Sequence, residues 1–246
     1  MSESEKKVQV EASSQATGEQ SPKAKKFKAV HRPTSESSSF WEKHDGKLVT
    51  SLKKYFDSGE YSDIKICSTE REFKVHKLVV CGQSEYFARA FNGNGNWVEK
   101  EEKAIYLKED HPRAVLAMIF FFYGFDWSSP SFDRGDLSYP VLLVMLYQLA
   151  DKYAIPLLKK QSKNFFEKHI KVIWIGSDFL LAIAEAYQRT IKSDRALRGP
   201  IVKTCLEHLK VLKQKEDFKK ILEEVDGFAA DLVLEFGQLN GSFKLY

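Results

Sequence analysis

The sequence predicts an α+β fold in which a small mixed sheet is covered by a cluster of helices and followed by an all-helical C-terminal extension. Segments with the two-residue period of β-strands are confined to residues 64–107. Segments with the helical period precede that region and fill the chain from residue 111 onward. With 246 residues, of which 43% are hydrophobic, the chain can bury a sizeable core.

The first helix is predicted by apolar residues that recur at helical spacing. Leu48, Leu52, Tyr55 and Phe56 fall on one face, and the lysines between them fall elsewhere. Gly59 ends this amphipathic helix.

Three short strands and two short helices are predicted next. A polar turn joins the first two strands into a β-hairpin. Gly82 separates the two helices, and Ser84 suits the N-cap of the second. In chain order these elements are strands at 64–67 and 73–75, helices at 76–81 and 84–91, and a strand at 103–107.

The remaining elements are all helical. The first of them, at 111–123, is apolar nearly all round and should be central and buried, with Asp110 as its N-cap and Pro112 in its first turn. A polar insert at 126–137 follows. The later helices are expected at 138–153, from Pro156 onward, at 179–190, at 201–212, and at 218–236 with a break near Gly227.

Composition excludes several classes of function. The net charge of +4 is dispersed, so we expect neither a nucleic-acid partner nor a membrane partner. Cys67, Cys81 and Cys205 are widely spaced and lack the paired spacing of zinc or redox sites, which favours reduced core thiols. Together with the polar N-terminus, this predicts an intracellular protein, with no choice made between nucleus and cytoplasm.

Residues 1–39 hold almost no large apolar side chains and are predicted to form a disordered polar tail. A loose basic cluster within it either binds an import receptor or phosphates, or is simply solvated. Its members are Lys23, Lys25, Lys26, Lys28 and Arg32.

Catalytic chemistry has no obvious residues in this chain. The sequence contains no hydrolase, metalloprotease or phosphate-loop motif and no clustered cysteines and histidines. His76 follows a strand and begins a helix, so we expect it to be a structural residue hydrogen-bonded at that junction. We therefore expect no enzyme activity, no cofactor, no metal and no small-molecule substrate.

Four stretches of sequence, taken in order, carry a family resemblance. They are Tyr61–Ile64 (aromatic-Ser-Asp-aliphatic), Phe73–Val80 (a strand leading into a helix), Ser84–Phe91 (Ser-x-x-Phe-x-x-x-Phe) and Leu149–Leu158 (beginning Leu-Ala-Asp-x-Tyr). Together they resemble the BTB/POZ domain. The resemblance covers about residues 45–170, and the helices that follow look like those of many fungal members. We expect a domain at 40–170 and a helical extension at 171–246.

The resemblance implies a homodimer and a charged pocket. In BTB dimers the first helix packs against a partner copy, which assigns the interface to Leu48, Leu52, Tyr55 and Phe56. The alternative is that this face packs within the chain. The positions of Asp63 and Lys77 line a charged pocket near the dimer interface of BTB domains. The alternative is that both side chains satisfy local backbone groups.

The resemblance also implies a protein partner. BTB proteins that recruit a cullin scaffold carry a hydrophobic-x-Glu element after the Phe-containing helix, and Trp97 and Glu99 stand there in this chain. Tyr86 and Phe87 on that helix, together with surface residues of the helix at 141–153, are expected to add contacts. We therefore expect an adaptor that joins a cullin-class ubiquitin ligase scaffold to a target bound by the trailing helices. The alternative is a dimeric scaffold or a regulatory protein, such as a transcription-linked one, that engages no ligase.

Overall fold

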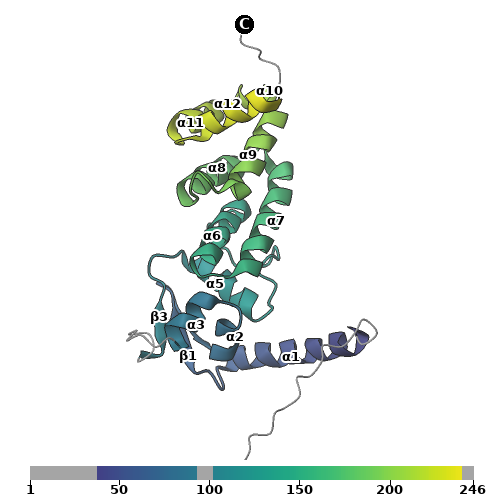
Figure 1. Ribbon diagram of the computed structural model, residues 1–246, viewed down its shortest axis with the longest axis vertical. Helices are drawn as coiled ribbons and strands as arrows, with labels where there is room; N and C mark the ends of the chain where they lie inside the picture. The colour runs from purple at the N-terminus through teal and green to yellow at the C-terminus, as the bar shows by residue number, and fades with distance from the viewer. Residues whose placement is uncertain (1–37, 93–101, 240–246) are drawn as a thin grey trace, which may run out of the picture. The chain divides into compact units, whose positions relative to one another are not determined.

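The computed structural model describes residues 38–92 and 102–239 (Figure 1). The tail predicted at 1–39 therefore lies almost entirely outside the described residues. By their contacts, residues from Lys43 onward form one compact unit, which includes all elements discussed below except the first five residues of helix α1 (Ser38–Ser58). The predicted α+β class is confirmed.

The sheet has three strands in the order β2-β1-β3. Strands β1 (Ile64–Cys67) and β2 (Glu72–Val75) pair antiparallel, with Ile64 opposite Val75, which confirms the predicted hairpin. Strand β3 (Ala104–Tyr106) pairs parallel to β1. A parallel pair needs a crossover connection, and helices α2 (Lys77–Cys81) and α3 (Glu85–Asn92) lie in that crossover.

Helix α3 begins at the cap that the sequence predicts. The Ser84 hydroxyl accepts a hydrogen bond from the Phe87 backbone N–H at 3.2 Å. The same hydroxyl donates to the backbone carbonyl of Tyr153 at 2.6 Å, in a buried position. One side chain therefore caps α3 and also ties it to a segment 69 residues later in the chain.

Helix α5 (Pro112–Phe122) is the buried centre of the domain, as its apolar sequence predicts. The expected N-cap was wrong. His111 caps the helix by accepting the Arg113 N–H at its Nδ1 atom, at 3.2 Å. Asp110 instead accepts hydrogen bonds from the Tyr153 hydroxyl and from the Lys152 ammonium group. A carboxylate that has two strong donors within reach does not need the helix terminus.

The polar insert at 126–137 follows α5 without forming a helix or a strand. It is anchored by the buried rings of Trp127 and Phe132. The ring of Phe132 contacts Phe120 of α5 edge to face. The segment is therefore polar at the surface and apolar at two points of attachment.

Helices α6 (Tyr139–Lys152) and α7 (Pro156–Ile173) pack side by side, each with a proline in its first turn (Figure 1). The extension continues from them, with α8 packed on α6 and α9 packed on α7. The helix predicted at 201–212 is divided at His208. The extension comprises α8 (Ser177–Arg189), α9 (Arg195–Glu207), α10 (Leu209–Leu212), α11 (Glu216–Glu224) and α12 (Phe228–Leu239).

Polar contacts fix the extension onto α6. Asp194 caps α9 by accepting the Ala196 N–H, and it accepts the Tyr147 hydroxyl of α6 at 2.8 Å. Burial and this carboxylate raise the pKa of Tyr147 to about 12.

Arg198 of α9 is buried and donates to the carbonyls of Tyr187 and Thr190 at the end of α8. A cation placed there satisfies the free carbonyls and the negative end of the helix dipole.

His76 is the structural residue that the sequence predicts. Its backbone N–H donates to the Tyr123 hydroxyl at 2.8 Å, and its Nδ1 atom lies 2.7 Å from the same oxygen. Its Nε2 atom lies 2.8 Å from the Glu60 carbonyl, which can only accept. The neutral ring therefore carries its proton on Nε2, and Nδ1 accepts the proton of the Tyr123 hydroxyl. Burial raises the pKa of Tyr123 to about 12.

We predict that Tyr123→Phe lowers the free energy of unfolding by about 1–3 kcal/mol, because it leaves the His76 N–H and Nδ1 without their buried partner. Urea denaturation followed by circular dichroism measures the change. Tyr106→Phe removes a hydroxyl from an exposed tyrosine and should leave the stability within error. Equal stability of the two variants would contradict the role given to Tyr123.

Candidate protein-docking groove

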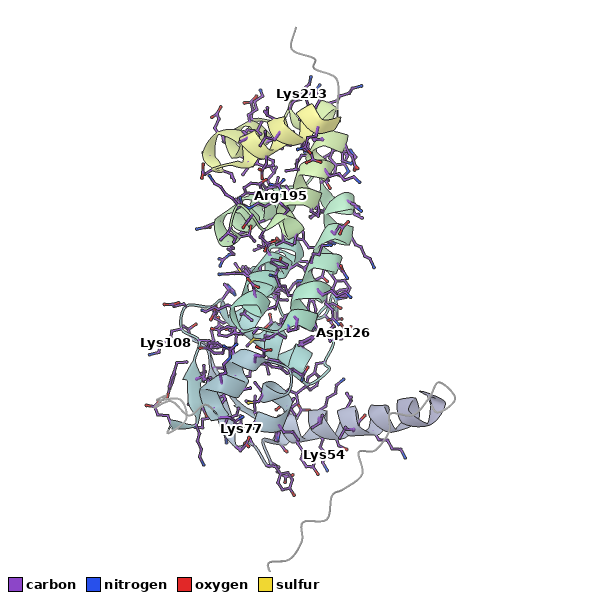
Figure 2. The ribbon with its side chains drawn as sticks, in the orientation of Figure 1. Lys54, Lys77, Lys108, Asp126, Arg195 and Lys213 are labelled. Atoms are coloured by element: carbon purple, nitrogen blue, oxygen red, sulfur yellow. The ribbon has the colours of Figure 1, made fainter. Side chains whose placement is uncertain are left out.

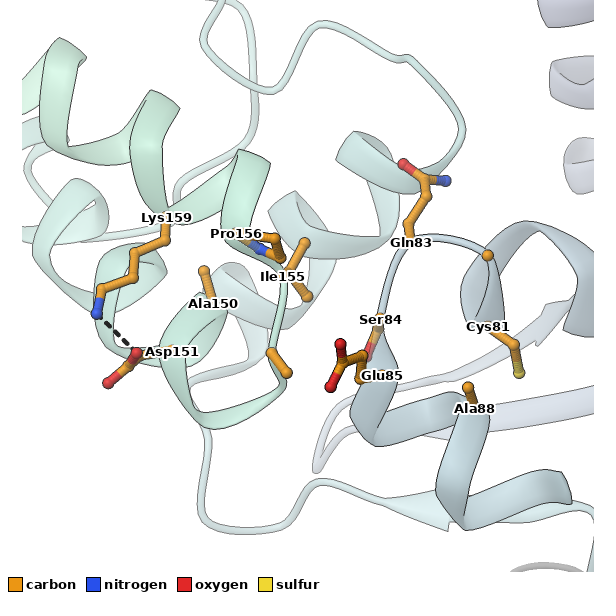
Figure 3. Close-up of a pocket in the computed structure, with 12 residues that line it drawn as sticks. Cys81, Gln83, Ser84, Glu85, Ala88, Ala150, Asp151, Ile155, Pro156 and Lys159 are labelled. Atoms are coloured by element: carbon orange, nitrogen blue, oxygen red, sulfur yellow. Dashed lines mark hydrogen bonds and ion pairs between the residues drawn. The ribbon is translucent and has the colours of Figure 1, made fainter. Parts of the chain in front are cut away.

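A groove of about 540 Å³ lies between the α2–α3 turn and the α6–α7 turn. We call it the α3–α6 groove. Figure 3 shows its two walls, with Cys81 and Ala88 on one side and Ala150, Ile155 and Pro156 on the other. Most of its lining is apolar, and its charged residues, Glu85, Asp151 and Lys159, are exposed or half-buried. Such a shape suits the side chains of a polypeptide partner.

The first wall depends on a glycine. A Cβ atom at Gly82 would lie 2.8 Å from the Leu78 carbonyl oxygen, which is closer than real Cβ atoms come to a backbone oxygen. Glycine therefore permits the tight passage from α2 to α3. Ser84 follows two residues later and holds this wall against Tyr153 of the second wall.

The second wall is a Schellman motif at the end of α6. The Ile155 N–H donates to the Ala150 carbonyl and the Ala154 N–H donates to the Asp151 carbonyl. Ala154 has a φ of +50°, in the left-handed region where glycine is usual. The motif reverses the chain so that α7 starts directly at Pro156. This tight reversal brings Ile155 and Pro156 to the groove.

The rim of the groove is charged but not catalytic. Lys159 forms an ion pair with Asp151 at 2.6 Å, as Figure 3 shows. Glu85 forms an exposed pair with Arg89. Partial burial raises the pKa of the Cys81 thiol, which makes it a weaker nucleophile at neutral pH. These groups can orient a charged partner, but they do not form a nucleophile with an activating base.

The structure corrects one expected contact. Phe87 is fully buried, with its ring stacked on Tyr153 and edge to face on Phe122, so its side chain belongs to the core and cannot touch a partner. Tyr86 is half-buried and contacts the Tyr153 ring. Trp97 and Glu99 lie outside the described residues.

The predicted dimer face of α1 is divided between two environments. Phe56 packs on the rings of Tyr123 and Phe125, at centroid distances of 4.6 and 5.6 Å, and Leu52 also packs against the core. Tyr55 contacts the exposed ring of Tyr61. Leu48 is 61% exposed. Part of this face is therefore used within the chain, and its N-terminal part is open to another molecule.

Asp63 and Lys77 each have a backbone partner. The Asp63 carboxylate accepts the Lys77 N–H at 2.7 Å, at the start of α2. The Lys77 ammonium group donates to the Phe91 carbonyl near the end of α3, at 3.0 Å. The two side chains form no ion pair with each other in the part of the chain that the structure describes. The geometry favours local backbone satisfaction, and a shared charged pocket at a dimer interface stays a prediction.

Sequence reasoning expected the helix at 141–153 to contribute to scaffold binding, but it did not identify the turn after this helix as part of the second wall. Ala150, Ala154 and Ile155 are small or apolar residues that look like ordinary core positions. A signal was present, because Pro156 marks the helix boundary at which the chain reverses.

Two further findings concern metal binding and membrane-spanning helices. Among the described residues, no three His, Cys, Asp or Glu side chains come together as a metal site would require. No helix within those residues is both long enough and apolar enough to cross a membrane.

Parts of this chain resemble known proteins. The family model for the BTB/POZ domain matches residues 52–170. BTB/POZ domain-containing protein At2g30600 of Arabidopsis thaliana is 31% identical over 125 residues, which are 50% of this chain and 14% of that protein. Human germ cell-less protein-like 2 is 40% identical over 67 residues, which are 25% of this chain and 12% of that protein. The chain thus matches about one seventh or less of the length of these relatives.

Two solved structures also match. The BTB domain of zebrafish PATZ1 is 17% identical, with a TM-score of 0.39, over 52% of this chain and 94% of that one. The BTB domain of human Gigaxonin is 15% identical, with a TM-score of 0.38, over 56% of this chain and 98% of that one.

The family match covers β1 to α7 and includes every motif that the sequence analysis identified between residues 61 and 158. BTB domains are protein–protein interaction modules and are generally not enzymes. Residues 52–170 of the chain are therefore a BTB/POZ domain, a protein–protein interaction module.

Proposed function

We propose that this protein is an adaptor that recruits a cullin-class ubiquitin ligase scaffold through the α3–α6 groove and the residues that follow α3. The observation that carries the proposal is the groove itself, because its lining is apolar and its rim is charged. Helix α3 forms one side of the groove and leads directly to Trp97 and Glu99 in the sequence. The trailing helices would then hold the target.

The groove has the features of a protein-binding hot spot. It is concave, its two walls are tied together by the buried Ser84–Tyr153 hydrogen bond, and its charges lie at the rim. A prearranged pocket of this kind loses little conformational entropy when a side chain enters it. Trp97, which follows α3 in the sequence, is of a residue type that often dominates binding energy.

We predict that Trp97→Ala with Glu99→Ala weakens binding of a purified cullin N-terminal domain by about 30-fold or more, because loss of a hot-spot residue costs about 2 kcal/mol or more. Ala88→Glu, which places a charge in the groove, should have a similar effect. Thr69→Glu adds the same charge in the exposed turn between β1 and β2 and serves as the control. Isothermal titration calorimetry measures the affinities, and melting temperatures verify folding.

Alkylation of Cys81 gives a second measurement at the same groove. Iodoacetamide at mildly alkaline pH should modify Cys81 before the buried Cys67 and Cys205, and bound scaffold should slow the Cys81 reaction. If the Ala88→Glu protein binds the scaffold as tightly as wild type and Cys81 is not protected, the groove is not the docking site.

A second candidate function is a self-associating scaffold that engages no ligase. The exposed position of Leu48 on α1 favours it, since a large apolar side chain on an open helix face is typical of an interface between copies. This proposal and the adaptor are compatible. The self-associating scaffold requires no cullin, and the adaptor requires no dimer.

We expect the wild-type chain to sediment as a dimer at micromolar concentration and Leu48→Asp to shift it to a monomer, because a buried carboxylate would lack a partner in the interface. Thr50→Asp adds the same charge at an exposed position about 200° around the helix from Leu48 and should retain the dimer if the interface centres on the Leu48 face. Sedimentation equilibrium distinguishes the states. A monomeric wild-type chain would rule out the self-association proposal.

A further inference from the structure

Three aliphatic side chains are exposed where α7 ends. Val172 is 76% exposed, Ile175 is 53% exposed and Val211 of α10 is 43% exposed. Together with the Trp174 and His208 rings between them, they form what we call the Trp174 surface. The structure describes all five residues, and the family match ends before them, at residue 170.

Direct contacts join the two segments of this surface. The Trp174 and His208 rings are stacked, with centroids 3.8 Å apart and planes within 4°. The Lys215 ammonium group donates to the Ile175 carbonyl at 2.5 Å. Val172 and Ile175 are three residues apart at a helix end, and so are His208 and Val211, so each pair shares a face. Figure 1 shows the end of α7 beside α9 and α10.

The Trp174 surface carries an excess of lysines. Residues 167–175 and 207–216 contain five lysines and three glutamates, Glu167, Glu207 and Glu216. Lys171 pairs with Glu167, which Lys163 also shares. Lys168, Lys210 and Lys213 form no ion pair with any residue that the structure describes. Figure 2 labels Lys213 at the end of α10.

The charges and the aliphatic groups lie on the same side of the helix. Lys168 is four residues before Val172 on α7, so these two side chains are neighbours on one helix face. Ile175 lies just past the end of α7, and Lys171 is four residues before it in the sequence. A partner that covers the apolar groups would therefore bring its own charges within reach of uncompensated ammonium groups.

We propose that the Trp174 surface binds an acidic polypeptide segment that carries large apolar side chains. The apolar residues of the segment would cover Val172, Ile175 and Val211, and its carboxylates would face the lysines. Complementary charge speeds association and selects the partner, while apolar contacts supply much of the affinity. Exposed aliphatic groups make a nucleic-acid ligand a poorer fit, because its backbone offers them nothing to cover.

This inference goes beyond the proposed ligase function and does not depend on it. The groove borders the first turn of α7, and the Trp174 surface borders its last turn. The 18 residues of α7 separate them by about 27 Å. Substitutions at one surface can therefore be tested with the other intact.

The experiment measures fluorescence anisotropy of the full chain with a labelled synthetic peptide in which glutamates alternate with leucine and phenylalanine. A second peptide replaces the apolar residues by serine. We expect the first to bind and the second to bind about tenfold or more weakly. Higher salt should weaken binding of the first peptide. Failure of the first peptide to bind overturns the proposal.

Three variants locate the site. Lys210→Glu with Lys213→Glu should weaken binding about tenfold or more, and so should Ile175→Ser with Val211→Ser. Lys54→Glu with Lys108→Glu changes the net charge equally at exposed positions elsewhere, labelled in Figure 2, and should retain wild-type affinity. Melting temperatures verify that each variant is folded. Equal losses in the control, or no loss in either test variant, would overturn the assignment.

Two other probes test the class of partner. Single-stranded RNA and vesicles containing phosphatidylserine should bind more weakly than the acidic apolar peptide. If either binds more tightly and loses affinity in the Lys210→Glu/Lys213→Glu protein, the partner is not the acidic segment proposed here. The Ala88→Glu groove variant should bind the peptide as wild type does, so a failure of the cullin experiment leaves this result unaffected.

Discussion

The hydroxyl group of Tyr123 joins the end of α5, the junction of β2 and α2, and the segment before β1. The positions of the other elements of the domain depend on it. It accepts the His76 N–H at the junction of β2 and α2 and donates to the ring of the same histidine, whose far nitrogen holds the Glu60 carbonyl. The Tyr123 ring also supports Phe56 of α1. Because Tyr123 is almost completely buried, water cannot replace these partners, and the start of α2 is fixed relative to the end of α5.

The groove follows from this constraint through a second tyrosine. Once α2 is fixed, Gly82 turns the chain into α3, and Ser84 fastens α3 to the Tyr153 carbonyl. Tyr153 is itself held by its hydroxyl on Asp110 and by its ring on Phe87. Both walls of the groove are therefore positioned by buried contacts. The open space between them is a property of the folded backbone and does not require a partner to form it.

Sequence periodicity predicted the order and type of the elements because burial of one face repeats with the geometry of each helix and strand. It assigned the Ser84 cap correctly, since a cap is a local contact. It failed for Asp110, whose partners Lys152 and Tyr153 lie more than 40 residues away in the chain. The family resemblance placed Phe87 on a contact surface, and only the packing of Phe122 and Tyr153 around it decides its burial. The groove could not be predicted for the same reason.

Helix α7 gives the two proposed binding surfaces a fixed relation. It is one continuous helix packed along α6 and α9, and the Tyr147–Asp194 contact adds a further tie between α6 and the start of α9. Arg198 then binds α9 to the end of α8 without a carboxylate partner among the described residues, so the helix carbonyls themselves compensate its charge. A scaffold bound in the groove and an acidic segment bound at the Trp174 surface would thus be held at one separation by elements that are already ordered. Little of the binding energy would be spent on ordering the connection between them.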